Sequence, residues 1–99
     1  MLTTGLGEVA KFIKQHPDSK VWLNSFVDLV SRANWKNIMD VRQIYPHADA
    51  VGTCTVFNIK GNHYRLIVTI DYQAQIIDIK KVLTHAEYDK EKWKKDCGG

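Results

Sequence analysis

The sequence lacks any apolar segment long enough to cross a membrane. None of its apolar runs approaches the roughly 20 residues that span a bilayer as a helix. Its 44% hydrophobic and 25% charged residues are typical of a globular protein. The first residues, Met1 to Gly7, contain neither the basic start nor the apolar stretch of a secretory signal. We therefore expect a cytoplasmic protein with no membrane partner.

Cysteine is also scarce, with Cys54 in a β-branched segment and Cys97 near the end of the chain. There is no C-x-x-C and no histidine at ligand spacing, so the pattern of a zinc site is missing. Gly5-Leu6-Gly7 follows no strand and has no third glycine at the spacing of a dinucleotide fingerprint. We expect no metal, no cofactor, two reduced thiols and a frayed end at 96–99.

Neither length nor net charge singles out a function. The 99 residues suit a single domain over 1–99, and a net charge of +3 does not by itself identify a nucleic-acid binder. Eight of the 14 basic residues, however, lie from Lys60 onward. They are Lys60, Arg65, Lys80, Lys81, Lys90, Lys92, Lys94 and Lys95. The last four fit equally well a solvated helix end, where cations meet the negative end of the dipole.

The first half of the chain has the hydrophobic period of amphipathic helices. One helix is expected over 8–15 and is ended by Pro17, and a second is expected over about 18–33, capped by Asp18 or Ser19. A short third helix over 37–44 is closed by Pro46. The expected core positions of the first two helices are Val9, Phe12, Ile13, Trp22, Phe26, Leu29, Val30 and Ala33.

The second half changes to the period of two that is typical of strands. Strands are expected over 53–59, 63–72 and 76–83, with Gly61-Asn62 supplying the positive-φ residues of the first turn. Short connections favour an antiparallel meander. Alternation places Tyr64, Leu66, Val68 and Ile70 on one face and Arg65, Ile67, Thr69 and Asp71 on the other.

Thr84 and Glu87 have the spacing of a capping box, which predicts a helix from His85 to about Lys95. Together these elements predict an α+β fold, with N-terminal helices packed on an antiparallel sheet and a helix at the C-terminal end.

The residues between Lys60 and Tyr88 form a candidate site for RNA cleavage. Such cleavage needs a base for the 2′-hydroxyl, an acid for the leaving 5′-oxygen and fixed positive charge near the phosphorane. Arg65 and Lys80 can clamp a phosphate, His85 can transfer a proton, and Tyr88 can stack on a nucleotide or pass a proton. These four are the candidate catalytic residues. The candidate RNA-binding residues are Lys60, Asn62, His63 and Lys81.

Each of these residues also has a simpler explanation. His85 can be a surface residue that follows a threonine cap, and Tyr88 can be a half-buried packing residue. Arg65 can be a cross-strand partner of Asp71 or Asp78. Considered alone, the residues therefore predict an anion site and no specific reaction.

Four segments resemble those of HigB-type toxins of the RelE-like superfamily of bacterial mRNA interferases. They are Asn34-Trp35-Lys36, Val56-Phe57-Asn58-Ile59-Lys60-Gly61-Asn62, Tyr64-Arg65-Leu66 and Thr84-His85-Ala86-Glu87-Tyr88-Asp89-Lys90. The resemblance covers roughly 12–94 in a consistent order. It implies a small RelE-like fold, cleavage of mRNA without a metal, generally on the translating ribosome, and neutralisation by a HigA-type helix-turn-helix antitoxin.

By the same resemblance, Arg65, Lys80 and His85 fall where the superfamily has its basic and acid–base residues, and Lys60 and Tyr88 follow them. Members of the family usually open with a strand and basic residues, whereas 1–7 here contains glycines that disfavour a strand. We therefore expect the first strand to be missing or frayed.

Three functions remain open from the sequence. They are a ribonuclease toxin, a non-catalytic RNA- or protein-binding module derived from one, and a partner-binding domain with no nucleic-acid role.

Overall fold

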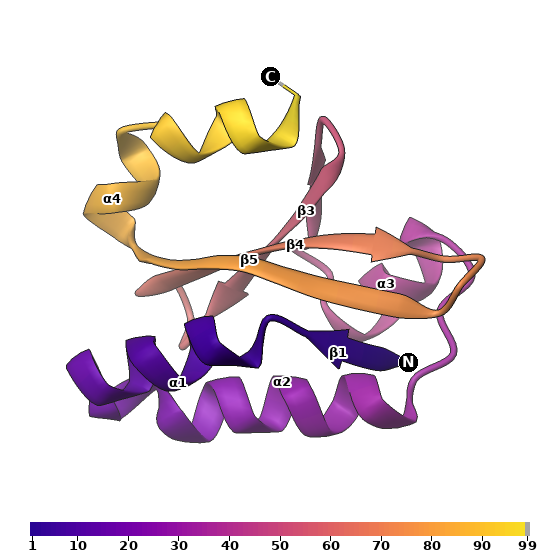
Figure 1. Cartoon of the computed structure of the whole chain (residues 1–99), viewed down its shortest axis with the longest axis horizontal. Coiled ribbons are helices and arrows are strands. Elements are labelled where there is room, and N and C mark those ends of the chain that lie inside the picture. The colour runs from indigo at the N-terminus through magenta and orange to yellow at the C-terminus, as the bar shows by residue number, and fades with distance from the viewer. Residues whose placement is uncertain (99) are drawn as a thin grey trace.

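One five-stranded sheet separates two groups of helical segments. The structure is a computed structural model that describes residues 1–98. The elements in chain order are β1 (Leu2–Thr4), α1 (Leu6–Gln15), the 3-10 helix η1 (Pro17–Ser19), α2 (Lys20–Arg32), α3 (Ile38–Ile44), β2 (Asp49–Val51), β3 (Cys54–Ile59), β4 (Tyr64–Asp71), β5 (Ile76–Thr84), α4 (His85–Asp89) and the 3-10 helix η2 (Lys92–Cys97). The strand order is β1-β5-β4-β3-β2, with α1 and α2 on one face and α4 and η2 on the other (Figure 1). The predicted α+β class is confirmed.

The N-terminal helices form close to where the sequence predicts. Asn37 begins α3 as an N-cap, because its side chain accepts hydrogen bonds from the backbone N–H groups of Met39 and Asp40. The expected side-chain cap of α2 is wrong, since the Ser19 hydroxyl donates to the carbonyl of His16 and the turn before α2 is η1. Within residues 1–98, no helix has the length and apolar character needed to cross a membrane.

The predicted antiparallel meander is formed by β3, β4 and β5. Ile59 lies opposite Tyr64 across the first connection, and Tyr64 lies opposite Thr84 in the next pair of strands. The positive φ angles of the first turn belong to Lys60 (53°) and Gly61 (63°), one residue earlier than expected.

The core fills the space between the sheet and α1, α2 and α3, on what we call the helix face of the sheet. Its buried members are Val9, Phe12, Leu23, Phe26, Val30, Trp35, Val41, Ala48, Phe57, Ile59, Tyr64, Leu66, Val68, Ile77, Ile79 and Val82. Ile13, Leu29 and Ala33 are partly buried against it. The even-numbered residues of β4 from Tyr64 to Val68 belong to this core, as their alternation predicts.

Trp22 is the one residue of the predicted helical stripes that does not pack in the core. Its side chain is 51% exposed, whereas its neighbour Leu23 is completely buried. At 3.6 residues per turn, Leu23 lies about 20° from Val30 around the helix axis and Trp22 lies about 80° away. The stripe that faces the sheet is therefore Leu23, Phe26 and Val30.

The expectation that the first strand would be missing is also wrong. β1 pairs in parallel with β5, with Leu2 opposite Ile76 and Thr4 opposite Asp78. Gly5 follows this strand, and its positive φ of 79° starts α1 at a point where a Cβ would collide with the carbonyl of Ile79. The glycine therefore lets the strand and the helix meet closely and does not interrupt the strand.

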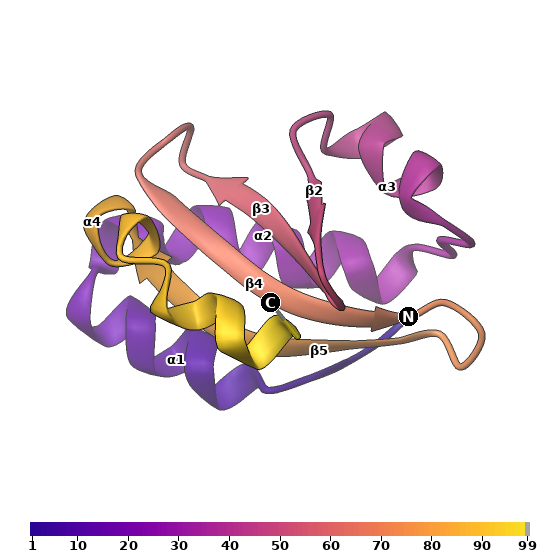
Figure 2. The same cartoon turned by 90° about the horizontal axis from the view of Figure 1, so that it is seen from above.

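The C-terminal segment crosses the opposite, outer face of the sheet (Figure 2). The expected helix to Lys95 ends at Asp89, because the chain turns at Glu91, whose φ is 60°, and continues as η2. This turn brings Trp93 into a second buried cluster on the outer face, whose members are Cys54, Val56, Ile67, Trp93 and Cys97.

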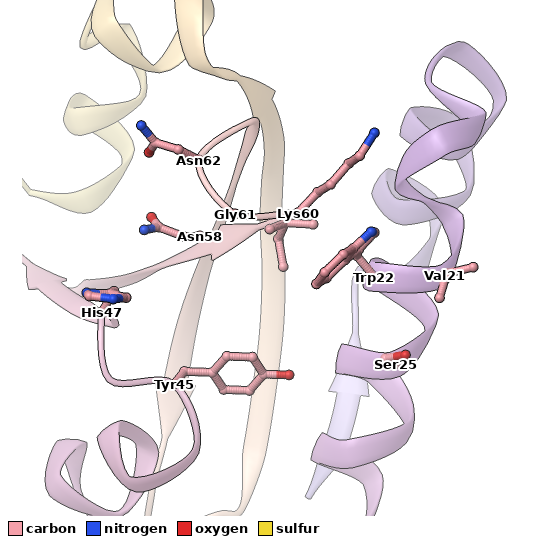
Figure 3. A pocket seen from close by; sticks show the side chains of 10 residues that line it. Val21, Trp22, Ser25, Tyr45, His47, Asn58, Lys60, Gly61 and Asn62 are labelled. Carbon is pink, nitrogen blue, oxygen red and sulfur yellow. The ribbon is translucent and has the colours of Figure 1, made fainter.

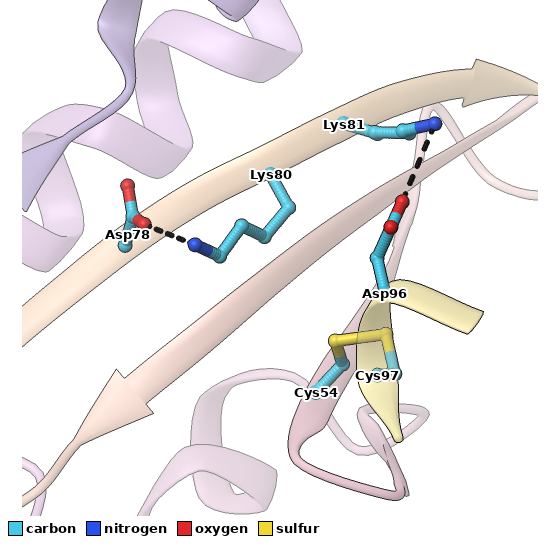
Figure 4. The surroundings of a disulfide bond; sticks show 6 residues. All are labelled: Cys54, Asp78, Lys80, Lys81, Asp96 and Cys97. Carbon is cyan, nitrogen blue, oxygen red and sulfur yellow. Dashed lines mark ion pairs between the residues drawn. A yellow bond between two sulfur atoms is a disulfide. The ribbon is translucent and has the colours of Figure 1, made fainter. Parts of the chain in front are cut away.

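A disulfide joins Cys54 to Cys97 (Figure 4), so the expectation of two reduced thiols is wrong. Cys97 is completely buried, and its carbonyl accepts a hydrogen bond from the N–H of Thr53. The chain is therefore held in place as far as this residue and is not frayed there, while Gly99 lies outside the described residues.

Candidate functional site

The β3–β4 turn and the start of α4 meet at one end of the sheet. The capping box of Thr84 and Glu87 is formed as predicted. Because Thr84 pairs with Tyr64, the helix begins beside the turn, and the N–H of His85 donates to the carbonyl of His63 at 3.2 Å. Five predicted site residues are thereby gathered at this end of the sheet: Asn62, His63, Arg65, His85 and Tyr88.

Arg65 is the centre of this group. Its guanidinium donates to the carbonyls of Asn62 and Tyr64, at 3.2 and 3.1 Å, and to the side-chain oxygen of Asn62. The ring of Tyr88 covers it, with 5.1 Å from the guanidinium carbon to the ring centre, and Trp93 stacks on the same ring at 4.9 Å. These contacts leave Arg65 only 8% exposed.

No carboxylate within residues 1–98 pairs with this buried cation. The possible pairing with Asp71 or Asp78 is wrong, because Arg65 lies opposite Leu83, whereas those two acids lie opposite Ile76 and Thr69. Arg65 is therefore a buried, hydrogen-bonded cation with no acidic partner among the described residues, and its role in an anion site stays a prediction.

His85 is oriented by a residue that the sequence analysis did not single out. Its Nδ1 lies 2.9 Å from a carboxylate oxygen of Asp89, one helical turn later, and its side chain is 45% exposed. With Nδ1 engaged, Nε2 is the nitrogen that can exchange a proton with a substrate. The spacing of four residues between histidine and aspartate on a helix was the available signal.

Lys80 and Lys81 lie at an irregularity in β5. Ile67 pairs with Lys81 and Val68 with Ile79, so Lys80 is an extra residue in the strand, which is the pattern of a β-bulge. Lys81 is on the outer face, two residues from the position opposite Arg65, and forms an ion pair with Asp96 at 3.5 Å (Figure 4).

Lys80 is drawn away from the Arg65 group. Its Nζ lies 2.6 Å from a carboxylate oxygen of Asp78, which lies opposite Thr69, four residues along β4 from Arg65. The hydrogen bond from Lys80, followed by one from Thr4, holds the pKa of Asp78 below its usual value. The predicted clamp of Arg65 and Lys80 is therefore not assembled in this arrangement.

Lys60 is directed to the helix side of the molecule. Its Nζ lies 2.8 Å from a carboxylate oxygen of Asp18, which also accepts hydrogen bonds from the Tyr64 hydroxyl. The hydrogen bond from Lys60, with that from Tyr64, lowers the pKa of Asp18, and the contact with Asp18 raises the pKa of Tyr64. His63 lies in the same turn as Lys60, and its Nδ1 forms a hydrogen bond with the carbonyl of Lys60 at 2.8 Å.

A small cavity lies beside the Arg65 group, between β5, α4 and η2. Its volume is about 270 Å³, and its lining residues are Lys81, Leu83, Glu87, Lys90, Lys92 and Trp93. Three lysines and one carboxylate give it a net positive lining. Lys90 and Lys92, which were not among the predicted site residues, thus lie near the Arg65 group. The run of lysines around Trp93 was the feature of the sequence that could have indicated them.

Residues 19–91 match the family model of the HigB toxin, described as the RelE-like toxic component of a toxin-antitoxin system. The chain belongs to this family. The mRNA interferase toxin HigB of Escherichia coli K12 is 25% identical to it over 79 residues, which cover 77% of this chain and 76% of the relative. The mRNA interferases HigB of Escherichia coli O157:H7 and Shigella flexneri match to the same extent.

The match to the HigB family includes all eight predicted site residues and Asp89, since these lie between Lys60 and Asp89. It leaves out β1 and α1 at one end and Trp93 and Cys97 at the other. The disulfide and the stacking of Trp93 on Tyr88 therefore connect the matched part of this HigB-family toxin to a segment beyond it.

Proposed function

We propose that this HigB-family toxin is an endoribonuclease that cleaves mRNA. The observation that carries the proposal is the buried Arg65 guanidinium, which has no carboxylate partner within residues 1–98 and lies against Tyr88 of the helix that carries the His85–Asp89 pair. A fixed cation beside a proton-transferring histidine is the minimal apparatus for breaking a phosphodiester. The interferase names of the relatives point to mRNA as the substrate.

In the proposed reaction the 2′-oxygen of a ribose attacks the adjacent phosphorus, and the bond from phosphorus to the 5′-oxygen breaks. A base takes the proton of the 2′-hydroxyl, and an acid gives a proton to the leaving 5′-oxygen. His85 transfers one of these protons through Nε2. Arg65 stabilises the negative charge of the phosphorane, and Tyr88, whose ring already contacts Arg65 and Trp93, passes the other proton through its hydroxyl.

The remaining predicted residues bind the RNA chain in this proposal. Lys81 lies on the same face of the sheet as Arg65, and Asn62 and His63 lie at the turn beside it. Lys60 and Lys80 reach RNA by exchanging their ion pairs with Asp18 and Asp78 for phosphate contacts. Both pairs are partly exposed, so this exchange costs little free energy.

We propose further that the substrate is mRNA on the translating ribosome and that a HigA-type helix-turn-helix antitoxin neutralises the toxin. Every proton and positive charge in the scheme comes from the chain itself, so the proposed reaction needs no metal ion bound to the toxin.

Cleavage of a translated mRNA, mapped by primer extension, tests the proposal. His85→Ala is expected to reduce cleavage by about 10²–10⁴-fold, the usual size of general acid–base catalysis. Arg65→Ala is expected to lower both cleavage and RNA affinity, because it removes charge from ground state and transition state alike. Circular dichroism controls for folding, and a folded His85→Ala protein that cuts like the wild type would show that His85 is only a surface residue.

The covering of Arg65 by Tyr88 favours one alternative, a non-catalytic RNA-binding module on the same scaffold. Expression of the chain separates the two. Growth arrest that depends on His85 requires an active enzyme, whereas salt-dependent RNA binding without cleavage fits the module.

A further inference from the structure

Half of β3 has no neighbouring strand on its β2 side. β2 pairs only with Cys54, Thr55 and Val56, whereas β4 pairs with β3 as far as Ile59. Within the described residues 1–98, no strand lies beside 57–59 on the side where β2 has ended. An unpaired edge of this kind offers main-chain donors and acceptors to another chain.

Asn58 is the residue whose main chain points out of this edge. Cys54 pairs with Val51 across a two-residue turn, and residues that flank such a turn exchange both of their hydrogen bonds. Backbone direction alternates along a strand, so the N–H and C=O of Asn58 point the same way as those of Cys54. The N–H and C=O of Phe57 and Ile59 point to β4 instead.

A groove of about 740 Å³ lies between this edge and α2 (Figure 3). Trp22 points from α2 toward β3, and the hydroxyl of Tyr45 points toward α2 from the other side. Trp22 is 51% exposed and its neighbour Val21 is 73% exposed. Exposed apolar side chains that share one groove indicate a binding surface.

The ionisable residues other than tyrosine that line the groove are basic. They are Lys60 and His47, and no aspartate or glutamate is among the lining residues. Asp18 balances part of this charge, because it pairs with Lys60 at 2.8 Å. The groove therefore suits a partner that is apolar beside Trp22 and neutral or acidic beside Lys60.

We propose that this edge and groove bind an extended segment of the antitoxin by adding a strand to the sheet. The main chain of that segment pairs with the N–H and C=O of Asn58. Its alternate side chains pack on Trp22 and Val21, and an acidic residue replaces Asp18 as the partner of Lys60. The inference rests on the proposed function, since a nuclease toxin needs a neutralising partner.

A peptide fits this surface better than RNA or a second copy of the chain. Its walls are largely apolar and its edge presents amide groups, whereas RNA binding depends on several cations, and Lys60 is the one lysine or arginine among the described lining residues. The exposed edge is only three residues long, which is short for pairing two folded sheets but sufficient to fix the register of one flexible segment.

Amide hydrogen exchange followed by NMR tests the strand addition directly. The probe is the antitoxin-type product of the reading frame adjacent to this one, added to the purified chain. The amide of Asn58 should exchange fast in the free chain and roughly tenfold or more slowly in the complex. The amides of Phe57 and Ile59 point to β4 and are the internal controls, protected in both states. An Asn58 amide that stays fast in the complex overturns the proposal.

Binding of the same probe to variants tests the groove. Trp22→Ser should weaken binding by about 30-fold or more, the effect of losing a central aromatic anchor. Asn58→Pro should also weaken it, because it removes the outward N–H without touching the bonds to β4. Met39→Ser removes another exposed apolar side chain, which is 65% exposed and does not line the groove, and should bind like the wild type.

The outcomes separate this inference from the proposed function. Trp22→Ser should still cleave mRNA while escaping the antitoxin. If wild type and Trp22→Ser are both inactive on mRNA, the proposed function fails. Binding of the probe to the two proteins then still tests whether the groove binds the antitoxin. If folded Trp22→Ser and Asn58→Pro both bind the probe like wild type, the groove proposal fails and nuclease activity is unaffected. Protection of Asn58 by an RNA oligonucleotide, or by self-association without the probe, would assign the edge to another occupant and also overturn the proposal.

Discussion

Asp89 is the single residue whose role in proton transfer is easiest to isolate. It touches His85 through one contact of 2.9 Å and is itself exposed. Asp89→Asn should therefore leave the fold intact while the imidazole loses its fixed orientation. We expect kcat for RNA cleavage to fall about 10- to 100-fold with little change in KM, because misplacement of a catalytic group affects the chemical step.

The matched control is Asp28→Asn, which removes another exposed aspartate from an i,i+4 pair, here with Arg32. This control should cleave like the wild type. An Asp89→Asn protein with unchanged kcat would mean that His85 needs no orientation or takes no part in the reaction.

For single residues, the sequence predicted on which face of the sheet a side chain lies better than it predicted which side chains pack against it. Alternation placed Arg65 on the outer face correctly, because the strand period depends only on the backbone. It could not show that Tyr88 and Trp93 would stack over Arg65, since that stack depends on where the chain turns after α4. Trp22 was misplaced for a related reason, because an aromatic residue on the margin of a helical face fits either assignment.

Among the elements, β1 is attached to β5 by a contact that depends on pH. Asp78 accepts a hydrogen bond from Thr4 at 2.7 Å and pairs with Lys80, which keeps the pKa of its carboxyl below the usual value. A carboxyl with a lowered folded-state pKa stabilises the fold fully above its unfolded pKa of about 3.9, and the contribution is lost as pH falls through the folded value.

We therefore expect Asp78→Asn to flatten the acid side of the stability curve. Melting temperatures measured from pH 7 to pH 2 should fall for both proteins, but the difference between wild type and variant should shrink below about pH 4. A constant difference across that range would show that the charged form of Asp78 contributes nothing to the fold.

The disulfide makes the C-terminal segment part of the folded unit. It links residues 43 positions apart, from the start of β3 to the end of η2. Breaking a link of this kind typically costs about 2–4 kcal/mol. Denaturant unfolding with and without a reducing agent should show a loss of this size, and Cys97→Ser should show the same loss without reductant.

Reduction should leave Cys97→Ser unchanged, which controls for other effects of the reagent. Equal stability of the oxidised and reduced wild type would mean that the buried cluster around Trp93 holds η2 without the covalent link.

Most helices and strands were predictable from local patterns, whereas β2, the path of the chain after α4 and the pairing of β1 were not. The capping box fixed the start of α4 because both of its partners are local. The end of α4 at Asp89 and the path of η2 follow from the burial of Trp93 and Cys97, which are tertiary contacts. The pairing of β1 also depends on a strand at the other end of the sequence, so glycine content alone was a misleading guide.

The stability of the whole molecule depends on the aromatic centre of the core. Phe26 is 1% exposed and lies 4.8 Å from the ring centre of Phe57 and 5.5 Å from that of Tyr45. Phe26→Ala should lower the free energy of unfolding by about 3–5 kcal/mol, a large share of the stability of a small domain. Trp22→Ala on the same helix should cost far less, because half of that side chain is already exposed.

Thermal melts of both variants measure this contrast. Equal losses of stability would mean that Trp22 packs in the core and does not form an apolar wall of the groove beside β3.

The pairing of β1 with β5 has a consequence for the order of synthesis. Thr4 can pair with Asp78, 74 positions later, only after β5 has been synthesised, so β1 joins the sheet late. All eight predicted site residues also lie at Lys60 or beyond, so they leave the ribosome late. A truncated product that ends before β5 would therefore lack both the closed sheet and much of the site. On the proposed function, a fragment that ends before β5 is therefore expected not to cleave mRNA, because toxicity requires a chain that extends through β5 and α4.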